Sequence, residues 1–157
     1  MSDDVDGAPI SAEERRATAV ALFNLVWRLL EVPDRSPEQD DRLLHAAHAS
    51  RFHWGEVGES INLVRGEWQC SRVYSVLGRG EPALHHARRS LEICREHGIG
   101  DFDLAFAYEA MARAYLLAGD EDESARYVAL ANDAGTRIAE DDNRAVLLGG
   151  LADLPGG

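Results

Sequence analysis

Apolar residues recur every three or four positions along most of the chain, with polar residues between them. In the first such segment the spacing places five apolar side chains on one side of a helix: Val20, Phe23, Val26, Trp27 and Leu30. Ser11 and Glu14 have the spacing of a capping box, so we expect this helix to begin there and to reach about residue 31. No segment alternates between apolar and polar residues as a half-buried strand does. The pattern predicts an all-α protein.

Helix-breaking residues divide the chain into three hairpins and a short terminal helix. Ser36 and Pro37 favour the start of a second helix, which Gly55 and Gly58 should end near Trp54. The predicted hairpins span about residues 11–54, 59–97 and 101–139, and the terminal helix spans about residues 142–152. Residues 11–153 would then form a single domain, preceded by a disordered acidic tail over residues 1–10.

A helix-turn-helix pattern occurs twice, at a separation of forty-one residues. Under this shift three residues coincide with residues of the same type: Arg72, Tyr74 and Gly78 align with Arg113, Tyr115 and Gly119. Small residues follow the turn in both copies, where two helices must approach closely. A fixed period of this size predicts stacked helical hairpins.

The aligned positions resemble the tetratricopeptide repeat family. The resemblance rests on Tyr108, Ala112, Tyr115 and Gly119, and less strongly on Ser71, Tyr74, Gly78 and Ala83. It covers about residues 60–139 and implies a short right-handed superhelix of about six helices, in which the first helix of each hairpin lines a concave groove. The chain departs from the family in its period, which exceeds the usual 34 residues or so, and in Glu67, which aligns with Tyr108.

The groove implied by this resemblance would carry aromatic and arginine side chains. Its predicted lining consists of Trp27, Arg65, Trp68, Gln69, Arg72, Phe106, Glu109 and Arg113. Arginines beside an indole suit a carboxylate or phosphate attached to a flat apolar body. The resemblance therefore implies a non-catalytic binding module for a peptide segment or a small anionic molecule. In the alternative interpretation Arg72 and Arg113 pair with Glu109 inside the protein, and Trp27 and Trp68 only fill helix interfaces.

A second hypothesis concerns the histidines. His45 and His48 lie about 60° apart on one helix face, so both imidazoles could approach one ion or one substrate. Glu67 or Glu109 from later hairpins would complete a divalent metal site, or would act with a histidine as acid and base. These four residues are the candidates for a small helical enzyme or metal-binding protein. His85 shares its face with charged residues and is expected in solvent, and His86 is not a candidate.

The net charge of the chain limits the classes of partner that we expect. Twenty-eight acidic against sixteen basic residues give a net charge of −12, which repels phosphate backbones and anionic membranes. We therefore expect neither nucleic acid nor a membrane as partner, while a homodimer stays open. No apolar stretch reaches the 20 residues or so of a membrane span, and the acidic N-terminus disfavours a secretory signal, so we expect a cytoplasmic protein. Cys70 and Cys94 should lie at different heights in one hairpin, as reduced thiols.

Overall fold

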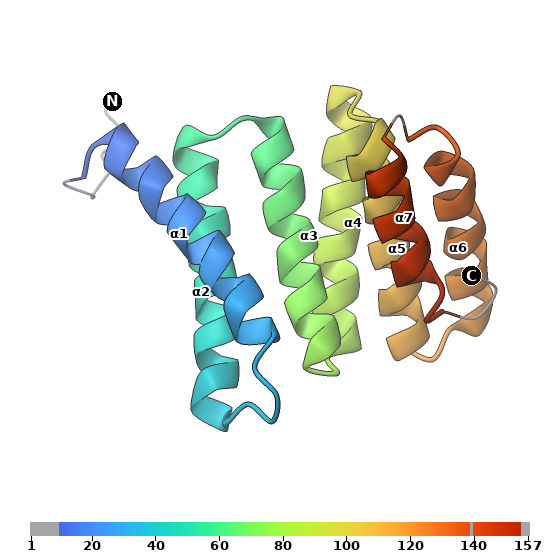
Figure 1. Ribbon diagram of the computed structural model, residues 1–157, viewed down its shortest axis with the longest axis horizontal. Coiled ribbons are helices and arrows are strands. Elements are labelled where there is room, and N and C mark those ends of the chain that lie inside the picture. The colour runs from blue at the N-terminus through green and yellow to red at the C-terminus, as the bar shows by residue number, and fades with distance from the viewer. Residues whose placement is uncertain (1–9, 139, 155–157) are drawn as a thin grey trace.

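The structure is a computed structural model that describes residues 10–138 and 140–154. Within these ranges the chain forms seven α-helices and no strand (Figure 1). The helices are α1 (Ala12–Leu30), α2 (Pro37–Val57), α3 (Ser60–Val76), α4 (Gly80–His97), α5 (Asp101–Leu117), α6 (Glu121–Gly135) and α7 (Asp141–Leu151). The predicted all-α class, with six helices and a short C-terminal one, is confirmed. None of these helices is long and apolar enough to cross a bilayer. The predicted tail, residues 1–10, lies outside the described residues except for Ile10.

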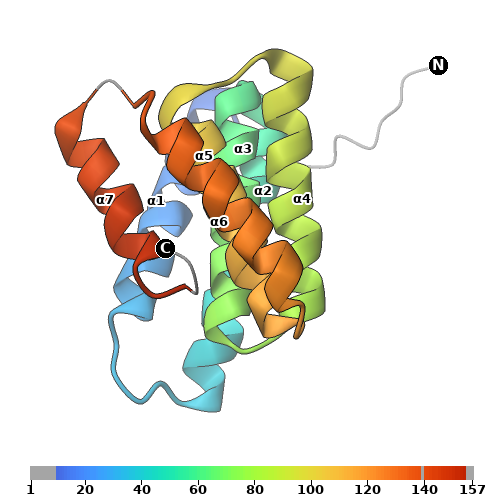
Figure 2. The ribbon, with the colours of Figure 1, turned by 90° about the vertical axis from the view of Figure 1, so that its right-hand side faces the viewer.

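The helices pair as antiparallel hairpins in chain order. The closest packing is within α1–α2, α3–α4 and α5–α6, and each hairpin also packs on the next through α2–α3 and α4–α5. Figure 1 shows the three hairpins side by side, with α7 lying in front of α5. The view turned by 90° places α7 on the side of the molecule where α1 lies and α4 on the opposite side (Figure 2). Thus α7 does not extend the row of hairpins but folds back across it.

Capping chemistry accounts for the first two helix starts. Ser11 and Glu14 form the predicted capping box of α1, and Ser36 and Gln39 form the predicted one of α2. In each case the serine hydroxyl accepts from a backbone amide of the first turn while the longer side chain accepts from the cap amide.

Two predicted helix ends are wrong, because contacts from distant segments decide them. Helix α2 continues through Gly55 to Val57, since Arg16 of α1 donates to the Val57 carbonyl at 3.0 Å and covers the ring of Trp54. Helix α6 ends at Gly135 and not near residue 139. At Gly135, Arg144 of α7 donates to the backbone carbonyl at 3.3 Å.

The repeat predicted from the forty-one-residue shift is present in the backbone. Gly78 and Gly119 both adopt positive φ angles, of 74° and 85°, which glycine tolerates without steric cost. A buried serine joins the two helices of each hairpin, but in opposite directions. The Ser71 hydroxyl of α3 donates to the Ala83 carbonyl, whereas at the same two positions of the next hairpin the Ser124 hydroxyl of α6 donates to the Ala112 carbonyl, both at 2.8 Å.

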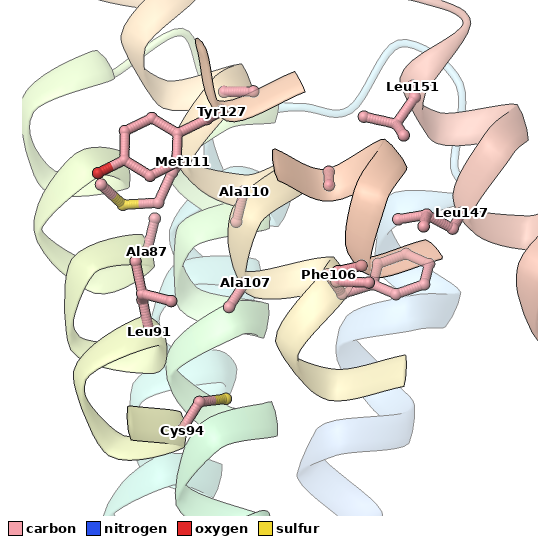
Figure 3. Close-up of a cluster of buried hydrophobic side chains, with 14 of the residues drawn as sticks. Ala87, Leu91, Cys94, Phe106, Ala107, Ala110, Met111, Tyr127, Leu147 and Leu151 are labelled. Atoms are coloured by element: carbon pink, nitrogen blue, oxygen red, sulfur yellow. The ribbon is translucent and has the colours of Figure 1, made fainter. Parts of the chain in front are cut away.

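The buried apolar residues form two clusters. The smaller one lies between α1, α2 and α3 and contains Leu43, Cys70 and Val73. The larger one extends from Val64 of α3 to α7. Figure 3 shows its centre, where Leu147 and Leu151 point from α7 towards the part of the core that holds Phe106. Helix α7 is therefore anchored in the core. Cys70 and Cys94 are buried, form no disulfide and belong to different clusters.

Candidate functional site

A cavity of about 540 Å³ lies between α1, α3, α5 and α7, and we refer to it as the aromatic cavity. Helical spacing brings its lining together, because Phe23 and Trp27 are four residues apart on α1 and Phe102 and Phe106 are four apart on α5. Trp68 comes from α3 between them, and the apolar wall is completed by Val146 of α7.

The five rings of the aromatic cavity form a continuous series of contacts. From α1 to α5 the ring centroids are 5.8 Å apart for Phe23–Trp27, 5.5 Å for Trp27–Trp68, 5.7 Å for Trp68–Phe106 and 4.5 Å for Phe106–Phe102. Tilted and edge-on arrangements of this kind are favourable for aromatic pairs and fix the rings relative to one another. The cavity wall is therefore preformed and mostly apolar.

One ion pair accompanies the rings. Arg65 of α3 donates from Nε and Nη2 to the two carboxylate oxygens of Asp103 on α5, at 2.9 and 3.2 Å. Asp103 is buried, whereas half of the Arg65 side chain is exposed. The hydrogen bond to Asp103 raises the pKa of Arg65 although burial opposes it. Arg65 is thus held in place at the edge of the cavity beside the carboxylate of Asp103, and Asp101 also lines the cavity.

The structure separates the residues that the sequence placed in one groove. Trp27, Arg65, Trp68 and Phe106 line the aromatic cavity. Gln69 is buried and points elsewhere, because its amide donates to the Phe23 carbonyl at 3.0 Å and joins α3 to α1. The sequence analysis missed seven lining residues: Phe23, Val64, Asp101, Phe102, Asp103, Asn143 and Val146. Phe23 and Phe102 each lie four residues before a predicted lining residue, Trp27 or Phe106, and this spacing could have indicated both phenylalanines.

The remaining predicted groove residues lie at the other end of α7. Arg113 Nε donates to the buried Glu109 at 2.8 Å, and Arg113 Nη2 donates to the Gly150 carbonyl at 3.1 Å. The pairing of Arg113 with Glu109 inside the protein, as the alternative interpretation has it, agrees with the structure. Arg72 does not join the pair and makes no hydrogen bond or ion pair with any described residue. Neither Arg72 nor Arg113 lines the aromatic cavity.

The two candidate histidines have different surroundings. His45 is exposed, whereas His48 is half-buried, with its Nε2 2.9 Å from the Tyr74 hydroxyl and its Nδ1 3.9 Å from the Cys70 sulfur. Burial, and then the proximity of His86, lower the pKa of His48. Because both ring nitrogens of His48 already have partners, they are poorly placed to bind an ion together with His45.

Glu67 lies near His48, but its partners are other residues. Its carboxylate accepts from Arg51 Nε at 2.6 Å and from His86 Nδ1 at 2.9 Å. Burial alone would raise the pKa of Glu67, but the hydrogen bonds and charges of His86 and Arg51 lower it. We refer to these residues together as the histidine cluster: His48, Arg51, Glu67, Tyr74 and His86. Glu109, the other candidate carboxylate, lies on α5 with Arg113.

His86 is central to this cluster although it was not a candidate. Its ring stacks on Tyr74, with centroids 5.6 Å apart, and contacts the His48 ring at 5.2 Å. The forty-one-residue shift aligns His86 with Tyr127, a packing position, and this alignment was the signal that could have indicated it.

The chemistry open to the histidine cluster is limited by how its atoms are used. Among the described residues no group of three or more histidine, cysteine or acidic side chains is arranged to hold a metal ion. Burial raises the pKa of Cys70 to about 12, so this thiol is protonated and a weak nucleophile at neutral pH. The cluster's polar groups bond to one another, while the aromatic cavity is open to an incoming group.

Comparisons with known proteins identify no relative. The chain matches no protein-family model, no curated protein and no solved structure. The function must therefore be inferred from the geometry of the site alone.

Proposed function

We propose that the chain is a non-catalytic binding module that takes an apolar or aromatic group with an adjacent negative charge into the aromatic cavity. The observation that carries this proposal is the continuous series of five aromatic rings around a space of about 540 Å³. That volume is within the range of small-ligand sites, which are mostly apolar with a few placed polar groups. The ligand would be a small anionic molecule or a side chain of a peptide segment.

Arg65 supplies the polar recognition in this proposal. Its Nε and Nη2 groups donate to Asp103, which fixes the guanidinium beside the rings. Its Nη1 group makes no hydrogen bond to the described part of the chain and can donate to a carboxylate or phosphate of the ligand. The resemblance to tetratricopeptide arrays also supports the proposal, because α1, α3 and α5, the first helices of the three hairpins, all line the cavity.

The alternative of an enzyme or metal site at His45 and His48 has less support. His45 is exposed, both nitrogens of His48 have partners, and Glu109 lies with Arg113 on another helix. Glu67 lies near His48, but Arg51 and His86 already bind its carboxylate oxygens. The candidate acid, base and ligands thus do not face one open space.

Blocking the cavity from α7 provides the sharpest test. Val146 lines the cavity and is largely exposed, so Val146→Trp should fill the space without disturbing the core. Leu148 on the same helix is also exposed but does not line the cavity, which makes Leu148→Trp the matched control. The probes are indole-3-acetate and an acetylated, amidated Trp-Glu dipeptide, added to ¹⁵N-labelled protein.

We expect both probes to shift the indole N–H signals of Trp27 and Trp68, with the Trp54 signal as internal reference because Trp54 does not line this cavity. Val146→Trp should weaken binding at least tenfold, equivalent to about 1.4 kcal/mol, and Leu148→Trp should leave it within about twofold. Tighter binding of the dipeptide would favour a peptide ligand. Probes that shift no indole signal, or that bind Val146→Trp as well as the parent chain, would refute the proposal.

A further inference from the structure

Arg72 differs from every other arginine that the protein removes from solvent. All sixteen basic residues of the chain are arginines. Those that are buried or half-buried each have a polar partner among the described residues, except Arg72: the partnered ones are Arg15, Arg35, Arg51, Arg89, Arg113 and Arg144. A guanidinium that loses water without gaining a partner is unfavourable, and a bound anion would remove that penalty.

The repeat explains why Arg72 is left without a partner. Arg72 and Arg113 occupy the same position of consecutive hairpins, and the residue one helical turn before Arg113 is Glu109, which binds it. One turn before Arg72 the chain has Trp68, whose ring belongs to the aromatic cavity. Trp68 therefore stands where a glutamate would neutralise Arg72, as Glu109 neutralises Arg113.

Arg72 lines a second cavity, of about 260 Å³, which we refer to as the arginine pocket. It lies between α3, α5 and the segment after α7, and it shares no lining residue with the aromatic cavity. Apart from the two aligned arginines its walls are mainly aliphatic, with Val76, Leu116, Leu117 and Leu154. Ser75 also lines the pocket, and its buried hydroxyl has no hydrogen-bond partner in the described part of the chain.

The arginine pocket holds one arginine without a bonded partner, together with a nearby carboxylate. Arg113 is already bound to Glu109 and to the Gly150 carbonyl, whereas Arg72 has no hydrogen bond or ion pair with the described residues. Burial and the proximity of Arg113 lower the pKa of Arg72, while Glu109 and Asp153 oppose this effect. Asp153 lines the pocket as well, and it would repel a doubly charged phosphate more strongly than a carboxylate.

We infer that the arginine pocket binds a carboxylate carried on a short aliphatic group, with Arg72 as its ion-pair partner and the leucines and Val76 around the aliphatic part. The carboxylate could belong to a free acid or to the end of a peptide, since the two share this chemistry. The site is separate from the aromatic cavity and does not depend on the proposed function.

The test uses the full chain with ¹⁵N-labelled arginine, so that each Nε–H group reports on its own surroundings. The probes are hexanoate, hexanol as the uncharged molecule with the same tail, inorganic phosphate, and a pentapeptide ending in Leu-Leu with either a free or an amidated C-terminus. The variants are Arg72→Met, which removes the charge, and Arg88→Met as control, because Arg88 is exposed on α4 and away from the pocket.

We expect hexanoate to shift the Arg72 signal and to bind at least tenfold more tightly than hexanol or phosphate. Arg72→Met should lose that binding at least tenfold while unfolding at the same temperature as the parent chain or higher, and Arg88→Met should bind hexanoate normally. A preference for the free over the amidated peptide, at an affinity above that of hexanoate, would assign the site to peptides.

The inference is overturned if hexanol binds as well as hexanoate, if phosphate is preferred, or if the parent chain's Arg72 signal does not respond. The last measurement needs no variant and so decides the matter even if Arg72→Met fails to fold. Indole-3-acetate shifts at Trp27 and Trp68 should persist in Arg72→Met, which separates a failure here from a failure of the aromatic cavity.

Discussion

The hairpins α3–α4 and α5–α6 have the same backbone plan but different side-chain chemistry at two of three aligned positions. Where α5–α6 has Tyr108, Tyr115 and Tyr127, α3–α4 has Glu67, Tyr74 and His86. In both hairpins the ring in the third position stacks on the tyrosine in the second, with centroids 5.6 Å apart and planes 6° and 15° from parallel. Both copies of the repeat therefore have a flat ring at the third position, and in α3–α4 this ring is not apolar.

The helix before each hairpin determines which chemistry the hairpin can hold. Two residues of α2 contact α3: His48 lies 2.9 Å from the Tyr74 hydroxyl, and Arg51 donates to Glu67. The buried Glu67 therefore has Arg51 as its counter-ion. At the corresponding positions α4 has Arg89 and Glu92, which pair with each other and supply nothing to α5–α6. An ionisable cluster is thus stable only in the hairpin whose neighbour completes it.

The largest expected effect comes from removing Arg51, the counter-ion that α2 contributes to Glu67. Arg51→Met leaves the buried Glu67 with His86 alone and should reduce the free energy of unfolding by about 3 kcal/mol, because breaking a buried ion pair strands a charge. Urea unfolding at pH 7.5 measures the change. Arg137→Met, which removes an exposed pair with Asp133, should change the unfolding free energy by less than about 0.5 kcal/mol.

The same experiment can be extended to convert one hairpin into the other. Adding Glu67→Tyr and His86→Tyr to Arg51→Met gives α3–α4 the aromatic residues of α5–α6 and should recover most of the lost stability. A triple variant as unstable as Arg51→Met alone would show that the two hairpins are not interchangeable at these positions.

A smaller effect concerns the reversed serine hydrogen bonds. Ser71→Ala and Ser124→Ala should each cost about 1 kcal/mol, the usual net value of a buried hydrogen bond. Combining Ser71→Ala with Ala83→Ser gives α3–α4 the bond direction of α5–α6, and thermal unfolding should then return close to that of the parent chain. If the double variant is less stable than Ser71→Ala alone, the direction of the bond matters to the hairpin.

The smallest effect is a dependence on pH that arises from His48, which α2 contributes to the histidine cluster. Because the pKa of His48 is lowered in the folded state, the folded protein binds this proton less readily than the unfolded chain. The contribution of His48 to stability is complete above about pH 6.5 and is lost as the pH falls towards its folded pKa. The charged and titratable neighbours His45, Glu67 and His86 stay in place in His48→Asn, the test variant.

Urea unfolding of the parent chain and His48→Asn at pH 7.5 and 5.5 measures this contribution. The parent chain should lose more stability than His48→Asn between the two values. An equal loss in both proteins would show that His48 does not titrate differently on folding.

The sequence predicted the hairpins well because their signals are local. Capping boxes, glycine turns and apolar spacing act within a few residues, so α1 starts at its serine cap and α5 starts at Asp101, where the third predicted hairpin begins. The end of α2 was wrong because a hydrogen bond from Arg16, forty-one residues before Val57, extends it. No local pattern contains that contact.

The lining of the aromatic cavity was predicted in part, for a geometric reason. Periodicity places Trp68 and Arg65 on the same face of α3, but consecutive helix residues differ by about 100°, and Gln69 accordingly turns into the α1 interface. Arg72 lies one turn further along, where the end of α7 and not the aromatic cavity is its neighbour. The path of α7 across the hairpins depends on distant packing of Leu147 and Leu151, so the division into two sites could not be seen in the sequence.

Helix α3 is the one helix whose described buried residues belong to both apolar clusters. Cys70 and Val73 face the first hairpin, while Val64 faces the rest of the protein. The apolar packing that joins the two halves therefore runs through this single helix, and the ring contact between His48 of α2 and His86 of α4 adds a second link. If α1–α2 opens, α3 loses one buried face and keeps the other, so the first hairpin is a partial unfolding unit that can detach while the C-terminal core persists.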